Sequence, residues 1–288
     1  VFYFIYRNAD QTDKIHAAIE KLASGETSYK VDVNDFSSLE AELAEGLNRI
    51  SDGLETALAE QVKSERLKAD LITNVSHDIK TPLTSIINYV DLIKRQHIED
   101  PTVQKYLEVL DQKSQRLKTL TEDLVEASRA SSGNIKLEIT NIDFVELVQQ
   151  TTGEFEEKYA IRHLEIVNTL PNEVIMIEAD GRRLWRVLEN LYNNAFKYAL
   201  EGTRVYVTIE DHGADVVFTI KNVSANPLNI SPDELTERFV RGDVSRTTEG
   251  SGLGLSIAKD LTTLQGGKFE LIIDGDLFKA QITFPIKN

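Results

Sequence analysis

A long amphipathic helix is the feature that most constrains the fold of this chain. Between residues 72 and 93, apolar residues recur every three or four positions, which is the period of one helical stripe. The stripe consists of Ile72, Val75, Ile79, Leu83, Ile86, Val90 and Ile93. After a predicted turn at Glu99-Asp100-Pro101, a second stripe consists of Tyr106, Leu110, Leu117, Leu120, Leu124 and Ala127. Because one helical hairpin cannot bury two such wide stripes, we predict a homodimeric four-helix bundle.

His77 lies off this stripe and is predicted to face water. It is two residues from both Val75 and Ile79, which places it roughly 200° around the helix from the apolar side. Asp78 can accept a hydrogen bond from Nδ1–H of the imidazole, which would leave the Nε2 lone pair free to attack an electrophile. Such a histidine can be phosphorylated. A surface His-Asp pair on an ordinary helix is the usual interpretation of the dipeptide taken alone.

Two further residues belong to the same stretch. Pro82 cannot donate a hydrogen bond to the carbonyl of Asp78, so we expect the helix to bend just past His77. Thr81 lies one turn from His77 on the same face, where its hydroxyl could hold a water molecule for attack on a phosphoryl group.

A second helix carries a polar face suited to a nucleotide. Its apolar side is Leu184, Leu188, Leu191 and Ala195, and its opposite side presents Asn190, Asn194 and Lys197, spaced four and three apart. Asn194 is the candidate Mg²⁺ ligand, because this hard cation prefers oxygen donors. Lys197 could meet a phosphate, and the ring of Tyr198 could stack against adenine. A merely solvated polar face is about as plausible for this motif alone.

A glycine-rich turn precedes the last predicted helix. Gly250, Gly252 and Gly254, together with Leu253, could bring backbone N–H groups and a helix N-terminus close to phosphate oxygens. Upstream, the segment from residue 225 to 251 could close over a nucleotide, with Phe239 as an apolar anchor and Arg241 or Arg246 reaching the γ-phosphate. Arg238 and Arg241 could equally form a solvated basic face.

Taken together and in this order, these motifs resemble those of the sensor histidine kinases of two-component signalling. The matching segments are 76–83 for the phosphoacceptor motif, 190–198 for the asparagine motif, 238–241 for the phenylalanine motif and 250–255 for the last glycine motif. The resemblance runs from about Glu65 to the C-terminus. It implies that His77 takes the γ-phosphoryl group of ATP, that Asp78 assists as a base and that Asn194 binds Mg²⁺.

The resemblance also implies a phosphotransfer partner. The phosphoryl group would pass from His77 to an aspartate in the receiver domain of a separate response regulator, after a hinge at Ser131-Ser132-Gly133 lets the nucleotide domain swing onto the bundle. We also hypothesise that Thr81 supports dephosphorylation of that regulator.

One family motif is altered. The family usually has an aspartate that accepts the adenine N6 hydrogen, and Asn222 stands in its place, with Ser224 in place of a glycine. An asparagine carbonyl can still accept that hydrogen bond, so nucleotide binding need not be lost. The change bears on two properties, the affinity for the nucleotide and the strictness of adenine selection.

Two other functions are open at this point. ATP-driven conformational ATPases share this nucleotide fold, but they place a water-activating glutamate four residues before the metal-binding asparagine, where this chain has Asn190. A catalytically silent dimeric scaffold that binds nucleotide weakly is the other alternative, and the change at Asn222 makes it conceivable.

Composition narrows the class of protein. A length of 288 residues predicts two or three domains, and a formal net charge of −15 argues against a nucleic-acid partner. The absence of cysteine excludes disulfides and thiolate metal sites.

The N-terminal part resembles a signal-relay module. Residues 1–6 are apolar but too few to span a bilayer, so we interpret them either as the stub of a membrane helix or as a short element of a soluble protein. The stub is the favoured interpretation, and it implies membrane attachment through a segment missing from this chain. Residues 7–60, with two helical patterns joined by a polar connector, resemble a HAMP domain; an ordinary coiled-coil linker is the alternative.

The predicted architecture is therefore multidomain, α and α/β. We expect a relay domain at 7–60, a dimerisation and phosphotransfer hairpin at 61–131, and a catalytic ATP-binding α/β sandwich at 132–288, on the cytoplasmic side of a bacterial membrane. In the sandwich, strands are predicted at 135–139, 164–169, 174–178, 205–210 and 216–221, with a hairpin at 271–284 turning at Asp274-Gly275. Helices are predicted at 143–158, 181–199 and 253–264, covering one face of a mixed sheet.

Overall fold

The computed structural model describes residues 2–36, 38–96, 98–133, 135–240 and 251–287. It divides into two compact units, Val1–Lys68 and Ala69–Asn288. None of the helices in these ranges combines the length and the apolar character that crossing a bilayer demands.

The first unit contains two helices joined by a connector. Helix α1 spans Phe2–Ala23, a short 3₁₀ turn spans Val33–Asp35, and helix α2 begins at Ser38. A small apolar cluster holds them together: Ala18, Val31, Phe36 and Ala44 are buried. Asn48 of α2 fixes the connector, because its Oδ1 accepts from the N–H of Val31 and its Nδ2 donates to the carbonyl of Val31, both at 2.9 Å. The predicted helix–connector–helix pattern is confirmed, and its assignment as a HAMP domain stays a prediction.

Helix α2 spans Ser38–Lys94 without interruption, and the boundary between the two units falls within it. Pro82 lies inside this helix and does not end it. The chain then turns, and helix α3 runs over Pro101–Ser131 with Asp100 as its N-cap, whose side chain accepts from the N–H of Thr102 at 2.8 Å. The predicted turn is confirmed.

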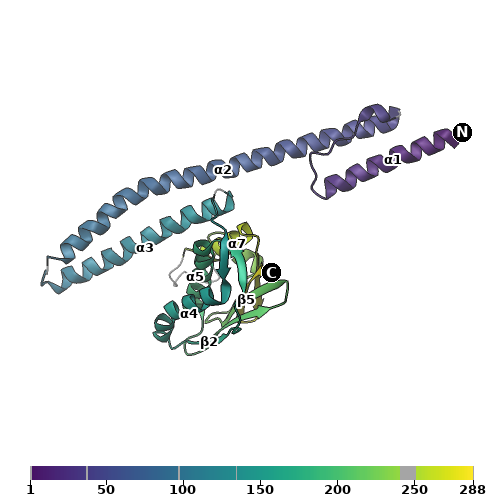
Figure 1. The fold of residues 1–288 in the computed structure, drawn as a ribbon. Helices are drawn as coiled ribbons and strands as arrows, with labels where there is room; N and C mark the ends of the chain where they lie inside the picture. Colours follow the sequence, from purple (N-terminus) through teal and green to yellow (C-terminus); the bar gives the residue numbers. More distant parts are fainter. Residues whose placement is uncertain (1, 37, 97, 134, 241–250, 288) are drawn as a thin grey trace. The chain divides into compact units, whose positions relative to one another are not determined.

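Helices α2 and α3 form a hairpin (Figure 1), and each of them buries side chains at a spacing of seven residues. The positions of this repeat, here called the seam, are Ala69, Ser76, Leu83 and Val90 on α2, and Leu107, Ser114, Thr121 and Ser128 on α3. Most of the predicted apolar stripe lies beside this seam and stays exposed in the single chain, including Val75, Ile79 and Ile86 on α2 and Tyr106 and Leu110 on α3. The hairpin therefore leaves apolar surface uncovered, as predicted.

The rest of the second unit is an α/β sandwich. A five-stranded sheet has the order β2-β4-β5-β7-β6, in which β2 is parallel to β4 and the other pairs are antiparallel. The strands are β2 (Glu165–Thr169), β4 (Arg204–Asp211), β5 (Asp215–Val223), β6 (Lys268–Asp274) and β7 (Leu277–Pro285). Strands β1 (Thr140–Asp143) and β3 (Met176–Ala179) form a separate antiparallel pair. The predicted mixed sheet is confirmed.

Three long helices cover the sheet. They are α4 (Phe144–Ala160), α5 (Gly181–Tyr198) and α7 (Gly254–Leu264), and the short helix α6 spans Pro232–Leu235. Between α4, α5 and the sheet lies an aromatic core that includes Phe144, Tyr159, Tyr192 and Phe218, all fully buried. The two buried tyrosine hydroxyls have partners: that of Tyr159 donates to the carbonyl of Tyr192 at 2.7 Å, and that of Tyr192 is 2.6 Å from Thr152 Oγ1.

Two details of the predicted sandwich are wrong. Residues 135–139 do not form a strand, because the N–H of Glu138 donates to the side chain of Asp180 (2.9 Å) instead of to a neighbouring strand. The β6–β7 hairpin turns at Gly275 and Asp276, one residue later than predicted, with Asp274 paired to Leu277. The positive φ of 56° at Gly275 suits the first position of a two-residue hairpin loop.

Candidate functional site

His77 is exposed on α2, as predicted from the helical period. Its side chain is 82% exposed. The predicted hydrogen bond to Asp78 is not formed, since Nδ1 of His77 and Oδ1 of Asp78 are 4.0 Å apart. Consecutive residues of a helix project about 100° apart and do not face each other, which explains this separation. Asp78 therefore supplies negative charge near the imidazole without fixing its tautomer.

Thr81 lies one turn after His77 and is exposed as well. Its Oγ1 is 3.5 Å from the carbonyl oxygen of His77, at the limit of a hydrogen bond. The hydroxyl is therefore only weakly held by its own helix.

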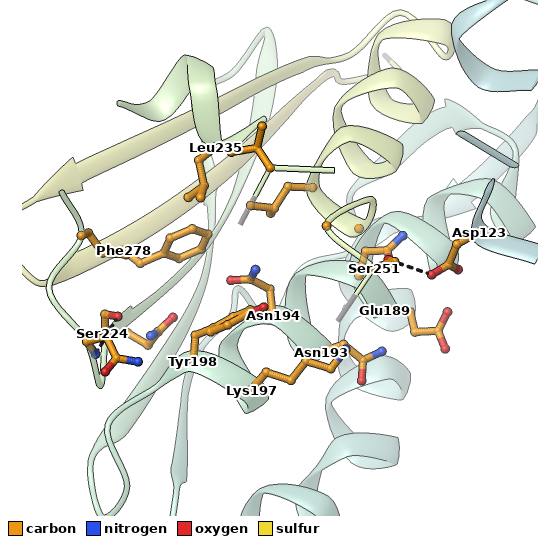
Figure 2. A pocket seen from close by; sticks show the side chains of 18 of the residues that line it. Asp123, Glu189, Asn193, Asn194, Lys197, Tyr198, Ser224, Leu235, Ser251 and Phe278 are labelled. Atoms are coloured by element: carbon orange, nitrogen blue, oxygen red, sulfur yellow. Dashed lines mark hydrogen bonds between the residues drawn. The ribbon is translucent and has the colours of Figure 1, made fainter. Parts of the chain in front are cut away.

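The second group of predicted residues lines one cavity of about 340 Å³ in the α/β sandwich (Figure 2). Seven predicted residues line it: Asn190, Asn194, Lys197, Tyr198, Asn222, Gly252 and Gly254. Leu253 is buried, with 2% of its surface exposed, and does not line the cavity. The other three predicted residues, Arg241, Arg246 and Gly250, lie outside the described ranges. Residues more than sixty positions apart in the sequence are thus brought to one cavity.

Helix α5 lines this cavity with its polar face, because its apolar face is buried in the core. Leu184, Leu188, Leu191 and Ala195 are fully buried against the core, which turns the asparagines and Lys197 outward. The helix is positioned by Asp180, the N-cap, whose side chain accepts from the N–H of Arg183 at 3.1 Å. The predicted division of this helix into an apolar and a polar face is confirmed.

One end of the cavity is apolar and holds a buried amide. Phe278, Leu228 and Leu235 line the cavity, and the sequence analysis did not find them. Asn222, at the end of β5, is 2% exposed, and its Oδ1 has no hydrogen-bond partner. An unpartnered buried acceptor costs about 1–3 kcal/mol, so this carbonyl is suited to a ligand donor.

The glycines at the start of α7 allow close packing. A Cβ at Gly252 would lie 3.0 Å from the backbone of Phe239 and Val240, and its φ of 71° is also unfavourable for other residues. A Cβ at Gly254 would lie 3.2 Å from Oδ1 of Asn190. These positions must therefore be small for the loop and α5 to approach the start of α7.

The segment around Phe239 differs from the prediction. Phe239 is 64% exposed and does not act as an apolar anchor; its N–H donates to the carbonyl of Gly252 at 3.0 Å. Arg238 is not merely solvated, because its Nη2 lies 3.3 Å from Oδ2 of Asp260.

Lys158 is a cation of the cavity that sequence reasoning missed. It comes from α4, and its Nζ donates to Oδ1 of Asn193 at 2.6 Å while it lies above the rings of Phe155 and Phe196. Burial lowers the pKa of Lys158, and the nearby charge of Lys197 lowers it further. Two lysines at one cavity favour an anionic ligand.

Helix α3 reaches the opposite end of the cavity. Ser251 Oγ donates to Oδ2 of Asp123 at 3.1 Å (Figure 2). Nη2 of Arg186 lies 2.5 Å from Oδ1 of the same aspartate. Arg186 also contacts Glu126 at 2.8 Å and Glu189 at 2.5 Å. Burial raises the pKa of Asp123 despite the neighbouring guanidinium. One arginine thus connects the α/β sandwich to two carboxylates of α3.

The chain matches two protein families. Residues 67–133 match the family described as His Kinase A (phospho-acceptor) domain, and residues 179–287 match the family described as Histidine kinase-, DNA gyrase B-, and HSP90-like ATPase. The first match contains His77, and the second contains the asparagines of α5 and the glycines of α7.

Several proteins with similar sequences are named sensor histidine kinases or sensor proteins. The sensor histidine kinase WalK of Bacillus subtilis is 28% identical over 80% of this chain and 39% of its own length. MtrB of Mycobacterium tuberculosis is 29% identical over 87% of this chain and 44% of its length. The sensor protein VanS of Enterococcus faecium is 31% identical over 77% of this chain and 58% of its length. The chain therefore spans about half the length of these relatives.

Solved structures share the fold. Full-length ShkA, in complex with AMPPNP, has a TM-score of 0.65 and 23% identity, covering 76% of this chain and 46% of that chain. The histidine kinase ThkA in complex with the response regulator protein TrrA has a TM-score of 0.54 and 23% identity, covering 81% and 67%.

The contact between α3 and the sandwich predicts a stability change. Arg186→Gln would leave three neighbouring carboxylates without their shared cation, so we expect a loss of about 2–4 kcal/mol in the free energy of unfolding. Urea unfolding followed by the fluorescence of Trp185, the single tryptophan, measures it. The control is Arg182→Gln, an exposed neighbour. Equal midpoints for the two variants would contradict the assigned role of Arg186.

Proposed function

We propose that this chain, which belongs to the sensor histidine kinases of two-component signalling, transfers the γ-phosphoryl group of ATP to Nε2 of His77. The observation that carries the proposal is the combination of an exposed histidine on α2 with a polar and apolar cavity on α5 and α7 in one chain. The first supplies a nucleophile, and the second supplies a site for a nucleotide.

The cavity fits adenine at one end and phosphates at the other. The free Oδ1 of Asn222 would accept the N6 hydrogen of adenine, beside the rings of Tyr198 and Phe278. Lys158 and Lys197 would neutralise phosphate charge. The N-terminus of α7, where Gly252 and Gly254 line the cavity, adds a favourable helix dipole.

Mg²⁺ fits the same site through amide oxygen. Asn194 would hold the ion together with the phosphates of the nucleotide, and Asn190 lies one turn before it on α5. The ion would supply neutralisation of the charge that develops on the γ-phosphoryl group.

Transfer requires the sandwich to change its position on the hairpin. The nucleotide cavity includes Thr119 and Asp123 of α3, whereas His77 lies on α2 and lines a different cavity. The two cavities share no lining residue among those described. Ser132 and Gly133, with a positive φ of 67° at Gly133, form the connection at which the domain would swing. Nε2 would then attack the γ-phosphorus in line, and ADP would leave.

The remaining surfaces fit a dimer and a relay. Exposed apolar residues beside the α2–α3 seam would pack against a second copy of the hairpin, giving a four-helix bundle. Since α2 is continuous from Ser38 to Lys94, rotation or sliding of its first half would reach His77 directly. Membrane attachment through a further segment stays a prediction.

The alternatives are less well supported. Asn190 occupies the position where the related ATPases have a base, and an amide cannot take a proton from water. A silent scaffold does not require an exposed histidine. We retain both as outcomes of the test below.

Incubation with γ-labelled ATP and Mg²⁺ should leave acid-labile label on the chain, because a phosphoramidate is hydrolysed in acid. His77→Gln should abolish the label, and the control His212→Gln, at an exposed turn position, should keep it. Released phosphate without labelled protein would favour the ATPase, and neither product would favour the scaffold.

Binding of ATP should take up protons in alkaline buffer. The pKa of Lys158 is lowered in the free protein, and phosphate charge would raise it, so above the lowered pKa the lysine gains a proton on binding. Affinity should therefore fall as the pH rises through that range. Calorimetry in two buffers of different ionisation enthalpy measures the uptake. Lys158→Met should remove the uptake, and persistence of the full uptake in this variant would assign it to another group.

We further propose transfer of the phosphoryl group to an aspartate of a response regulator, and dephosphorylation of that regulator with Thr81 holding the attacking water. Thr81→Ala should slow regulator dephosphorylation about tenfold or more and leave labelling of His77 intact. Ser85→Ala is the matched control, since its hydroxyl contacts the carbonyl of Thr81 (3.3 Å) one turn further on. Full phosphatase activity in Thr81→Ala would remove this part of the proposal.

A further inference from the structure

We propose that the cavity beside His77 is a binding site for a tetrahedral phosphate group, separate from the nucleotide site. The cavity has a volume of about 390 Å³ and is lined by residues of α2, α3 and α5. The residues that matter are Ser76, His77 and Lys80 on α2, Arg129 on α3, and Arg183 on α5. A water molecule occupies about 30 Å³ in the liquid, so the cavity has room for a phosphoryl group and several waters.

The first observation is an unsatisfied hydroxyl. Ser76 lines the cavity and is 3% exposed, and its Oγ has no hydrogen-bond partner. Other helical hydroxyls of this chain donate to the carbonyl four residues earlier, as in Thr84 (2.8 Å) and Thr152 (2.9 Å). Because a buried hydroxyl without a partner is unfavourable, a ligand with acceptor oxygens would stabilise this position.

The second observation is the charge around that hydroxyl. Lys80, Arg129 and Arg183 bring three cations to the cavity, and its carboxylates are Glu122 and Glu126. Glu126 is paired with Arg183 (3.0 Å from Nη1) and with Arg186 (2.8 Å from Nε), which leaves Lys80 and Arg129 against Glu122. A positive surplus is left at a site beside the phosphoacceptor, in a chain whose net charge is −15. Guanidinium groups match phosphate oxygens in a bidentate geometry.

The third observation is that the α/β sandwich completes the site. Arg183 at the start of α5 and Ile135 after α3 line the cavity together with the hairpin. A bound phosphate would therefore touch both the hairpin and the sandwich and favour this docked arrangement. In this arrangement the nucleotide cavity is separate from His77, so the site would act after phosphoryl transfer and not during it.

The phosphate could come from two sources with the same chemistry. One is the phosphoryl group on Nε2 of His77, and this source rests on the proposed function. The other is free inorganic phosphate. In either case the group is bound as an anion by Ser76 O–H and the cations, and no bond is formed or broken by the site.

Two measurements test the site. Calorimetric titration of the unphosphorylated chain with inorganic phosphate should show binding that Ser76→Ala and Arg129→Gln each weaken about tenfold or more. The decay of label on His77 should be several-fold faster in these two variants, because the bound phosphoryl group is shielded from water. Matched controls are Ser85→Ala on α2 and Lys105→Gln, an exposed cation of α3.

Folding is checked independently. Ser76→Ala removes an unsatisfied buried hydroxyl, so its thermal midpoint should be equal to or above that of the unchanged chain, and weaker phosphate binding cannot then be ascribed to unfolding. If the two variants weaken only the binding of inorganic phosphate, the ligand of the site is free phosphate. If they speed up only the decay of label on His77, the ligand is the phosphoryl group on that histidine. Neither effect, in a chain that labels His77 normally, overturns the site. A chain that binds phosphate but never acquires label keeps the site and refutes the proposed function.

Discussion

A single polar stripe on helix α5 is the constraint on which the rest of this structure depends. Its members are Arg183, Arg186, Asn190, Asn194 and Lys197, spaced three or four apart, and the opposite face of the helix is fully buried. Because the apolar face fixes the rotation of α5 in the core, the whole stripe must point outward together. Its C-terminal part lines the nucleotide cavity, and its two arginines meet carboxylates of α3. Nucleotide binding and docking of α3 therefore use one helix face.

This shared face explains why the two regions of the second unit are linked electrostatically. Asp123 contacts Arg186 and Ser251 and also lines the cavity proposed for the nucleotide. Its burial disfavours the charged carboxylate, while the guanidinium stabilises it. The phosphates of a nucleotide in this cavity would bring further negative charge towards Asp123. Binding of the nucleotide would therefore weaken the docking of α3 at this end of α5. The position of the sandwich on the hairpin is thus coupled to the ligand.

Local patterns in the sequence were sufficient to predict the helices and the residues that each helix presents on one face. The exposed position of His77 and the division of α5 into two faces follow from the helical period and are confirmed. The partners of these residues were not predictable in the same way. Lys158, Phe278 and Asp123 reach the nucleotide cavity from elements far apart in the chain, and only the tertiary packing brings them together. The failed strand at 135–139 has the same origin, since a distant side chain, Asp180, takes its backbone hydrogen bond.

The seam between α2 and α3 shows how one spacing can serve packing and chemistry at once. Ser76 falls on the buried seven-residue repeat with Ala69, Leu83 and Val90, and His77, the next residue, must then point about 100° away from it. A large apolar residue at position 76 would fill the seam, whereas serine leaves a small polar position directly beside the exposed imidazole. Serine or threonine also occupies three of the four buried repeat positions on α3, at 114, 121 and 128. Small side chains at these positions pack less apolar volume than leucine would supply, and two of them, Ser76 and Thr121, line the cavity next to His77.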